Sequence, residues 1–309
     1  MFSPIRLWFA VASDEDLGLL AGALVVAVLF SATPFFIPAV ADEFGITLGA
    51  AGLYATVQVG GFALAAFYAG RRLETSHRLF IGAVAAAVGA NILSAMADEL
   101  WPLLVFRFVA GVGAGLITWL AWAKGMRTAG ATRKVAAVGP LGALVGAPVS
   151  AWLISRHGLD AMFILLAVIN APIAFLPATF TGYRVSRHHV SPSRSNVVLL
   201  GGVGLLILSA SALFVQTAAI GERVLGLDPL VVSAGFCVNA LAGLAAASRP
   251  APSTVASWPA LAIGVCAAAV AWSGVGWLWF VAIVAWGGFF WLTVPRLLRA
   301  VALWSLVPE

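Results

Sequence analysis

Long apolar segments are the feature that most limits what this chain can fold into. Ten of them follow one another and take up most of the sequence. They are residues 17–41, 49–69, 79–97, 101–123, 135–154, 159–180, 196–219, 229–247, 258–273 and 276–298. As a helix, a stretch of about 20 apolar residues crosses the hydrocarbon core of a bilayer. The sequence therefore predicts an all-α, polytopic transmembrane bundle with about ten helices.

Charged residues are scarce and unevenly placed. The chain is 62% hydrophobic and 9% charged, whereas about a quarter of the residues in a soluble domain are charged. Most Lys and Arg residues lie at the N-terminus, after every second segment and after the last one, and most acidic residues lie in the other loops. This alternation is the positive-inside pattern. It predicts a multi-pass protein of the plasma (inner) membrane with both termini in the cytoplasm. It also accounts for the net charge of +5 without a nucleic-acid partner.

Residues suited to catalysis are missing from the middle of the segments. Every carboxylate lies in a loop or at a segment end, and the four histidines, His77, His157, His188 and His189, all lie in loops. The sequence contains no His-Glu-x-x-His metal motif and no serine nucleophile elbow. We therefore expect no enzymatic activity, no metal and no cofactor.

A polar interval divides the chain. Residues 181–196, "TGYRVSRHHVSPSRSN", read as a basic cytoplasmic linker. We expect an N-terminal six-helix bundle over residues 1–180 and a second bundle of helices seven to ten over residues 197–309.

The two parts share short patterns. Trp101 precedes Gly111 by ten residues, and Trp277 precedes Gly287 by ten. The second segment begins with "FGITLGAAG" and the eighth with "LGLDPLVVSAG", each with a residue suited to cap a helix N-terminus. These matches imply an internal repeat with an offset of about 176 to 181 residues, and internal repeats are common in secondary transporters.

Three stretches carry a resemblance to a known family. The loop "YAGRRLETSHRLF" places Gly70, Glu74 and Arg78 in a Gly-x-x-x-acid-x-x-x-Arg order. "RFVAGVGAG" contains Arg107, Gly111 and Gly113, and "GPLGALVGAPVSA" contains Gly142, Gly146 and Pro148. The chain resembles the major facilitator superfamily over essentially its whole length.

The resemblance implies a secondary active transporter that works by alternating access. It implies cytoplasmic gating by Gly70, Glu74 and Arg78, where the carboxylate acts against the start of an eleventh helix. Close helix packing is expected at Gly111, Gly113, Gly142, Gly146 and Pro148. The family has twelve helices, and this chain resembles one without the last two. We expect either a truncated reading frame or a ten-helix variant for which a partner chain supplies the missing helices.

Arg107 is the only charge in the middle of a segment. A central arginine costs about 2.5 to 3.5 kcal/mol on membrane-insertion scales. Two placements are open: its side chain reaches the outer interface, or it faces the interior and bonds backbone carbonyls near the first helix, an anionic substrate or a coupling group.

The substrate is expected to be a small organic solute of apolar or amphipathic character, as in drug or metabolite efflux. Polar and aromatic residues within the segments are the candidates to line its cavity. They are Tyr54, Gln58, Arg107, Trp119, Gln216, Asn239 and Trp286. Two alternatives remain: a ten-helix transporter of the drug/metabolite type, built as five plus five helices, and a truncated membrane scaffold that transports nothing.

Overall fold

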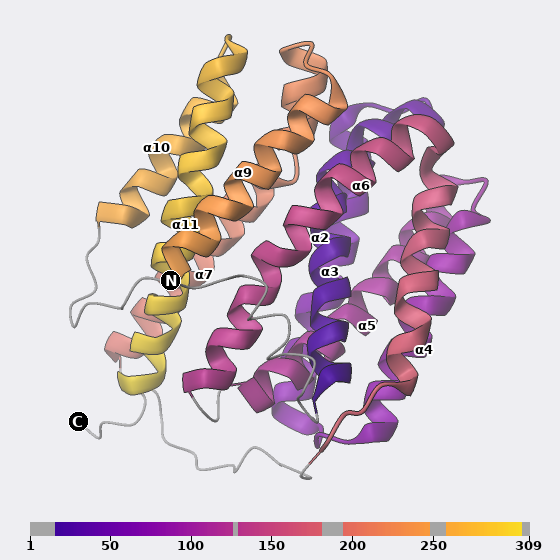
Figure 1. Ribbon diagram of the computed structural model, residues 1–309, viewed down its shortest axis with the longest axis vertical. Coiled ribbons are helices and arrows are strands. Elements are labelled where there is room, and N and C mark those ends of the chain that lie inside the picture. Colours follow the sequence, from indigo (N-terminus) through magenta and orange to yellow (C-terminus); the bar gives the residue numbers. More distant parts are fainter. Residues whose placement is uncertain (1–15, 126–128, 181–193, 248–257, 305–309) are drawn as a thin grey trace.

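Two groups of helices stand side by side in this protein (Figure 1). The structure is a computed structural model that describes residues 16–125, 129–180, 194–247 and 258–304. Within these ranges the chain is mostly helical and contains no strand. The predicted all-α transmembrane bundle is confirmed.

The first group contains α2 (Leu17–Glu43), α3 (Leu48–Arg72), α4 (His77–Ala95), α5 (Leu100–Gly125) and α6 (Ala129–Asn170), which is followed by the 3₁₀ turn η1 (Ala171–Phe175). The second group contains α7 (Arg194–Phe214), the short α8 (Thr217–Ala219), the π-helical turn η2 (Ile220–Val224), α9 (Pro229–Ala247), α10 (Trp258–Trp272) and α11 (Gly276–Trp304). Each predicted segment lies on these helices for most of its length. The predicted linker falls mostly outside the described residues.

One of these helices contains two predicted segments. α6 bends at Gly158, whose φ of 81° is not helical and separates a first limb from a second limb. Only glycine adopts such a φ without strain, so this residue marks the boundary between predicted segments five and six. Within the described residues, eight helices are long and apolar enough to cross a membrane. That number treats α6 as one helix and leaves out α10, which has 15 residues.

Two predicted segments end earlier than expected. The sixth was expected to run to residue 180, but the second limb of α6 ends at Asn170 and residues 176–180 are not helical. Pro172 and Pro177 lack the N–H that an α-helix requires. The seventh was expected to run to residue 219, but α7 ends at Phe214, before a turn that contains Gln216.

The starts of α3 and α9 are built in the same way. The Thr47 hydroxyl accepts a hydrogen bond from the Ala50 N–H at 3.2 Å, and the Asp228 carboxylate accepts one from the Leu230 N–H at 2.8 Å. Two residues before each cap lies a glycine with positive φ, Gly45 at 60° and Gly226 at 65°. The two predicted helix starts are therefore confirmed as local structures that match each other.

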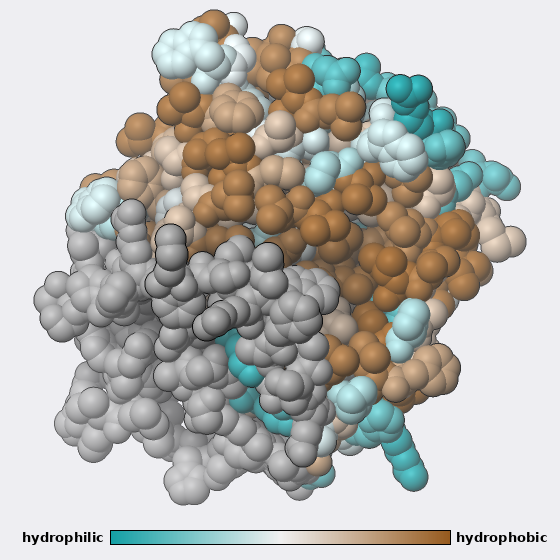
Figure 2. All heavy atoms as spheres, viewed as in Figure 1, coloured by the Kyte–Doolittle hydropathy of each residue, from teal (hydrophilic) through white to brown (hydrophobic). Residues whose placement is uncertain are grey.

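Two hydrophobic cores hold the molecule together. One lies inside the first group and includes Phe36, Leu103 and Phe163. The other joins Phe35 of α2 and residues of α6 to the second group. Apolar side chains also cover the middle of the face that Figure 2 shows, while hydrophilic ones gather toward its upper right and lower right. This distribution suits a surface surrounded by lipid.

The two ends of the bundle differ in charge. We call the end where α3 finishes and α4 begins the basic end, because Arg71, Arg72, Arg78 and Lys124 lie there. The opposite end is the acidic end, where the chain places Asp42, Glu43, Asp98, Glu99, Asp160, Glu222 and Asp228.

Candidate functional site

Arg107 is completely buried inside the first group. Its Nε and Nη2 atoms donate to the Ser94 hydroxyl at 3.0 and 2.6 Å, and Nη2 also donates to the Asn91 side-chain oxygen at 3.0 Å and the Ala90 carbonyl at 3.1 Å. All four bonds go to neutral acceptors on α4. The guanidinium also lies 4.6 Å from the centre of the Phe163 ring, a favourable position for a cation.

The interior placement of Arg107 is therefore the one that occurs. The carbonyl that it contacts belongs to Ala90 on α4, so the expectation of carbonyl partners near the first helix was wrong. The reason is geometric: α5 packs closely on both α3 and α4, and Arg107 faces the α4 side, where Ser94 and Asn91 supply oxygen atoms.

Tyr54 and Gln58 lie close to this arginine and are also completely buried. The Arg107 guanidinium is 5.9 Å from the centre of the Tyr54 ring, and the Gln58 amide donates to the Thr33 hydroxyl at 3.2 Å. Three atoms here, Arg107 Nη1, Tyr54 Oη and Gln58 Oε1, have no hydrogen-bond partner among the described residues. The structure thus unites three predicted cavity residues inside the first group of helices.

Four aromatic side chains lie where the two groups meet. Phe35 of α2 contacts Phe236 of α9, with ring centres 5.3 Å apart. Phe214 of α7 packs edge-on against Phe236 at 5.1 Å and against Trp286 of α11 at 6.0 Å. We call these four residues the aromatic cluster. Of the four, sequence reasoning singled out only Trp286, because phenylalanines in apolar segments carry no signal that separates a boundary from an ordinary core.

Pro148 opens a second contact between the groups. A proline cannot donate to the carbonyl four residues earlier, which here is the carbonyl of Leu144. The Cys237 thiol of α9 lies 3.4 Å from that oxygen and donates to it. Nearby, the Trp291 ring of α11 lies against Gly139 of α6, where an added Cβ would come within 2.7 Å of the ring. At these two points the face of α6 toward the second group is approached closely at a proline and at a glycine.

The groups also touch at the acidic end. Arg223 of η2 forms an ion pair with Asp42 at the end of α2. Gln216, a predicted cavity residue, lies in the turn after α7 with its amide nitrogen 3.0 Å from the position of a Cβ on Gly52 of α3. Gln216 is therefore placed at the boundary between the groups.

The remaining predicted residues lie elsewhere. Asn239 is buried within the second group and donates to the Ile283 carbonyl at 2.5 Å. Trp119 is half-buried beside Gly70. Its ring nitrogen lies 3.6 Å from the position that a Cβ added to Gly70 would take. Glu74 and Arg78 are exposed in the loop between α3 and α4 and at the start of α4.

The predicted packing glycines lie at close helix contacts. An added Cβ would overlap the Gln58 carbonyl at Gly111, would lie 2.7 Å from the Ala83 carbonyl at Gly113, and would overlap Ala27 at Gly142 and the Ser31 hydroxyl at Gly146. The contact at Gly111 has a counterpart in the second group, because a Cβ on Gly287 would overlap the Asn239 carbonyl. The α3–α5 crossing and the α9–α11 crossing are thus alike.

Two small cavities lie inside the first group and at its basic end. Two cavities among the described residues have room for about one water molecule each. One is lined by Asn91 and Asn170 inside the first group, and the other lies beside Lys124 at the basic end. Among the described residues, no group of three or more His, Cys, Asp or Glu side chains is placed to hold a metal ion.

Solved transporter structures share this fold. A D-xylose-proton symporter aligns with a TM-score of 0.62 and 13% identity, over 91% of this chain and 80% of the symporter. A bacterial homologue of the human lysosomal transporter Spinster, in an inward-facing and occupied conformation, aligns with a TM-score of 0.59 and 13% identity, over 99% of this chain and 79% of the homologue. At such identities the likeness concerns the fold alone.

Sequence comparison adds relatives from Mycobacterium tuberculosis. Proteins named Multidrug resistance protein B homolog, from strains CDC 1551 / Oshkosh and ATCC 25618 / H37Rv, are 31% identical over 140 residues. The match covers 43% of this chain and 24% of each relative, so it spans about a quarter of their length.

A family profile decides the assignment. The profile described as Major Facilitator Superfamily matches residues 19–306, which include every described helix of both groups except the first two residues of α2. The resemblance drawn from three short motifs is thereby confirmed, and the ten-helix drug/metabolite class is set aside as the family of this chain. The chain belongs to the Major Facilitator Superfamily of membrane transporters.

Proposed function

We propose that this protein moves a small apolar or amphipathic organic solute across the membrane, in the direction of efflux, by alternating access between its two helix groups. The single observation that carries the proposal is the aromatic cluster at their boundary. Phe35, Phe236 and Trp286 are almost completely buried there, and each is uncharged. In this conformation the four rings fill the place where a solute would bind.

The chemistry of the cluster sets the class of solute. Aromatic faces bind apolar surface and attract organic cations, whereas a sugar needs several polar groups that converge on its hydroxyls. The name of the mycobacterial relatives supports multidrug efflux, and the fold likeness to a xylose symporter does not extend to its substrate.

Arg107, Tyr54 and Gln58 have a different part in this proposal. Because they are buried inside the first group, they fix α5 against α3 and α4 rather than line the solute path. Gln216 and Trp286 keep the role of cavity residues, since both lie at the boundary. The basic end faces the cytoplasm, in line with the positive-inside pattern.

Dye binding to the purified protein tests this site. We expect a lipophilic fluorescent dye such as rhodamine 6G to bind and to raise the melting temperature, and D-xylose to do neither. Phe236→Leu replaces the ring with a smaller aliphatic side chain, and Trp286→Phe shrinks the ring. Each should weaken dye binding about tenfold, equal to about 1.4 kcal/mol.

The matched control is Trp272→Ala, because Trp272 is an exposed aromatic residue of the same group, outside the cluster. Equal binding by wild type and both cluster variants would overturn the aromatic site. A protein that binds no dye and shows no ligand-dependent melting shift would favour the non-transporting scaffold instead. A partner chain that supplies further helices stays a prediction.

A further inference from the structure

A short extended segment crosses the basic end of the first group. Residues 176–180, which we call the strap, follow η1 and are the last described residues before the sequence that joins the two groups (Figure 1). The Gly18 N–H donates to the Pro177 carbonyl at 2.8 Å. A Cβ on Gly18 would lie 3.0 Å from the Leu176 carbonyl oxygen, so the strap lies directly on the first turn of α2.

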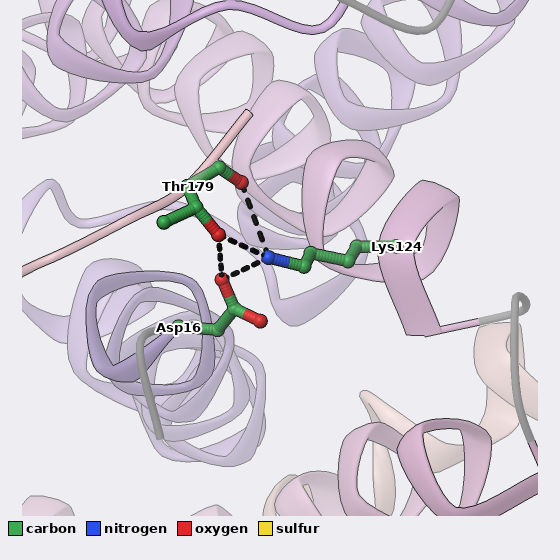
Figure 3. A network of polar contacts seen from close by, with 3 residues as sticks. All are labelled: Asp16, Lys124 and Thr179. Carbon is green, nitrogen blue, oxygen red and sulfur yellow. Dashed lines mark hydrogen bonds and ion pairs between the residues drawn. The ribbon is translucent and has the colours of Figure 1, made fainter. Parts of the chain in front are cut away.

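A three-residue polar network holds the strap in place (Figure 3). Lys124, in the last turn of α5, donates to the Asp16 carboxylate, to the Thr179 hydroxyl and, at 3.3 Å, to the Thr179 carbonyl. The Thr179 hydroxyl in turn donates to the same Asp16 oxygen at 2.8 Å. One ammonium group therefore joins the start of α2, the end of α5 and the strap.

This ion pair is better protected from water than the pair at the acidic end. The Asp16 and Lys124 side chains are 22% and 29% exposed, whereas Asp42 and Arg223 are 65% and 45% exposed. Hydrogen bonds between charged groups are about twice as strong as neutral ones, and partial burial reduces screening by salt. Lys124 also lies at a helix C-terminus, where a cation is favoured.

The strap adds only a small apolar contact of its own. Phe180 packs against Phe80 and His77 at the start of α4, with ring centres 5.8 and 6.0 Å apart. Pro177 and Thr179 are exposed, and a cavity with room for about one water lies beneath the segment. With little buried surface, the strap depends on the polar network and belongs to the part of the fold that opens most readily.

The strap also covers what lies beneath it. Leu19, Phe80 and Leu120 are buried at this end of the core, and Leu19, Leu120 and the buried Thr75 line the cavity under the strap. Thr75 belongs to the loop between α3 and α4, which also contains Glu74. Lifting the strap would therefore expose the end of the core and remove one wall of the cavity next to this loop.

We propose that the strap is a latch: the Asp16–Lys124–Thr179 network holds it closed over the basic end of the first group, and its release is a separate conformational step of this chain. The latch fixes the point where the inter-group sequence leaves the first group, and it is distinct from the gating role predicted for Glu74 and Arg78. Sequence reasoning did not single out its three residues, because they lie far apart in the chain.

Cysteine labelling in purified full-length protein measures the opening. Ala178 is a half-buried strap residue. Its Cβ lies 3.3 Å from the position that a Cβ added to Gly18 would take. Ala178→Cys, in a background with Cys237→Ala and Cys266→Ala, should react slowly with a water-soluble maleimide in detergent. Lys124→Met should increase the rate about tenfold. The charge swap of Asp16→Lys with Lys124→Asp should return it only part of the way to that of the parent, because it restores the ion pair but reverses the charges that the two helix ends favour and removes the bond from Lys124 to the Thr179 carbonyl.

Arg72→Met is the matched control, since it removes an exposed cation from the same end and should leave the rate unchanged. Thr179→Val removes only the hydroxyl and should give an intermediate rate, which keeps the test valid if Lys124→Met does not fold. A rise from 50 mM to 1 M salt should speed labelling of the parent and not of Lys124→Met. Equal labelling rates in the parent, Lys124→Met and Thr179→Val would overturn the latch.

Discussion

The α3–α5 crossing and the α9–α11 crossing have the same backbone contact and different chemistry. In each, a glycine lies under the carbonyl of an amide residue, Gly111 under Gln58 and Gly287 under Asn239. Four residues before the glycine, α5 has the buried Arg107, whereas α11 has Ile283, whose carbonyl accepts a bond from Asn239. The repeat thus preserves the helix contact, while each group has its own polar groups beside it.

The two groups also differ in how they cover their first helix. In the most apolar 18-residue window of α2, 72% of the residues are buried, against 11% for the helix that begins the second group. Both limbs of α6 contact α2, the first at Gly142 and the second at Phe163, whereas α7 presents Val198, Leu205 and Leu208 outward. The first group therefore encloses its first helix, whereas the second group leaves most of α7 on the surface.

The largest expected effect is on the shared backbone contact. Gly111→Ala and Gly287→Ala each place a Cβ against a carbonyl that cannot move without shifting a helix. Overpacking costs about 1 to 3 kcal/mol where side chains can adjust, so we expect at least the upper end here. Both variants should melt well below wild type in detergent, while Gly82→Ala, with open space at its Cβ, should not. If either variant has the same melting temperature as the Gly82→Ala control, the two crossings are not equivalent.

A smaller effect separates the two groups. Arg107→Met leaves the Ser94 hydroxyl oxygen and the Asn91 side-chain oxygen without their donor in the interior, while the Ala90 carbonyl still accepts from the Ser94 hydroxyl. At about 1 to 3 kcal/mol for each unsatisfied buried group, it should destabilise the first group by about 3 kcal/mol. Transport should be lost while the protein still reaches the membrane.

Asn239→Ala is the counterpart in the second group. It removes one bond to a backbone carbonyl and should cost about 1 kcal/mol. Thermal melting and dye efflux in proteoliposomes measure both variants. Unchanged transport by Arg107→Met, or an equal melting loss in Asn239→Ala, would remove the distinction between a charged and an uncharged crossing.

The smallest effect is expected where the groups meet at the acidic end. Asp42 and Arg223 are both largely exposed, and exposed ion pairs contribute about 0 to 1 kcal/mol. A double-mutant cycle with Asp42→Asn and Arg223→Gln should give a coupling energy within that range, and 1 M salt should abolish it. Arg156→Gln, an exposed cation of the same end, is the control. A coupling energy above 2 kcal/mol would instead show that this ion pair contributes strongly to holding the two groups together.

Several elements could be predicted from the sequence because they depend on nearby residues. The caps at Thr47 and Asp228 join residues two or three positions apart, and Gly158 separates the limbs of α6 through its own φ. Segment ends were less accurate: the sixth stops at Asn170 because of the prolines that follow, and nothing in the sequence signals the turn at Gln216.

The candidate site was predictable only in part. An arginine in an apolar segment was recognised as unusual, and its burial bears this out, but its partners on α4 were not foreseen. Of the aromatic cluster only Trp286 was named. Phe35 and Phe236 are 201 residues apart in the sequence and meet because of the way α2 and α9 are rotated.

By itself, the sequence determined that this chain is a membrane-spanning helical bundle of the Major Facilitator Superfamily, since hydrophobic length, helix caps and short glycine motifs are local properties. Only the tertiary structure decided that Arg107 bonds to α4, that Phe35 meets the aromatic rings of the second group, and that Lys124 joins the strap to α2. Such contacts depend on the rotation and tilt of each helix. The rotation and tilt of a helix are set by its packing against all neighbouring helices, so they cannot be inferred from a single sequence.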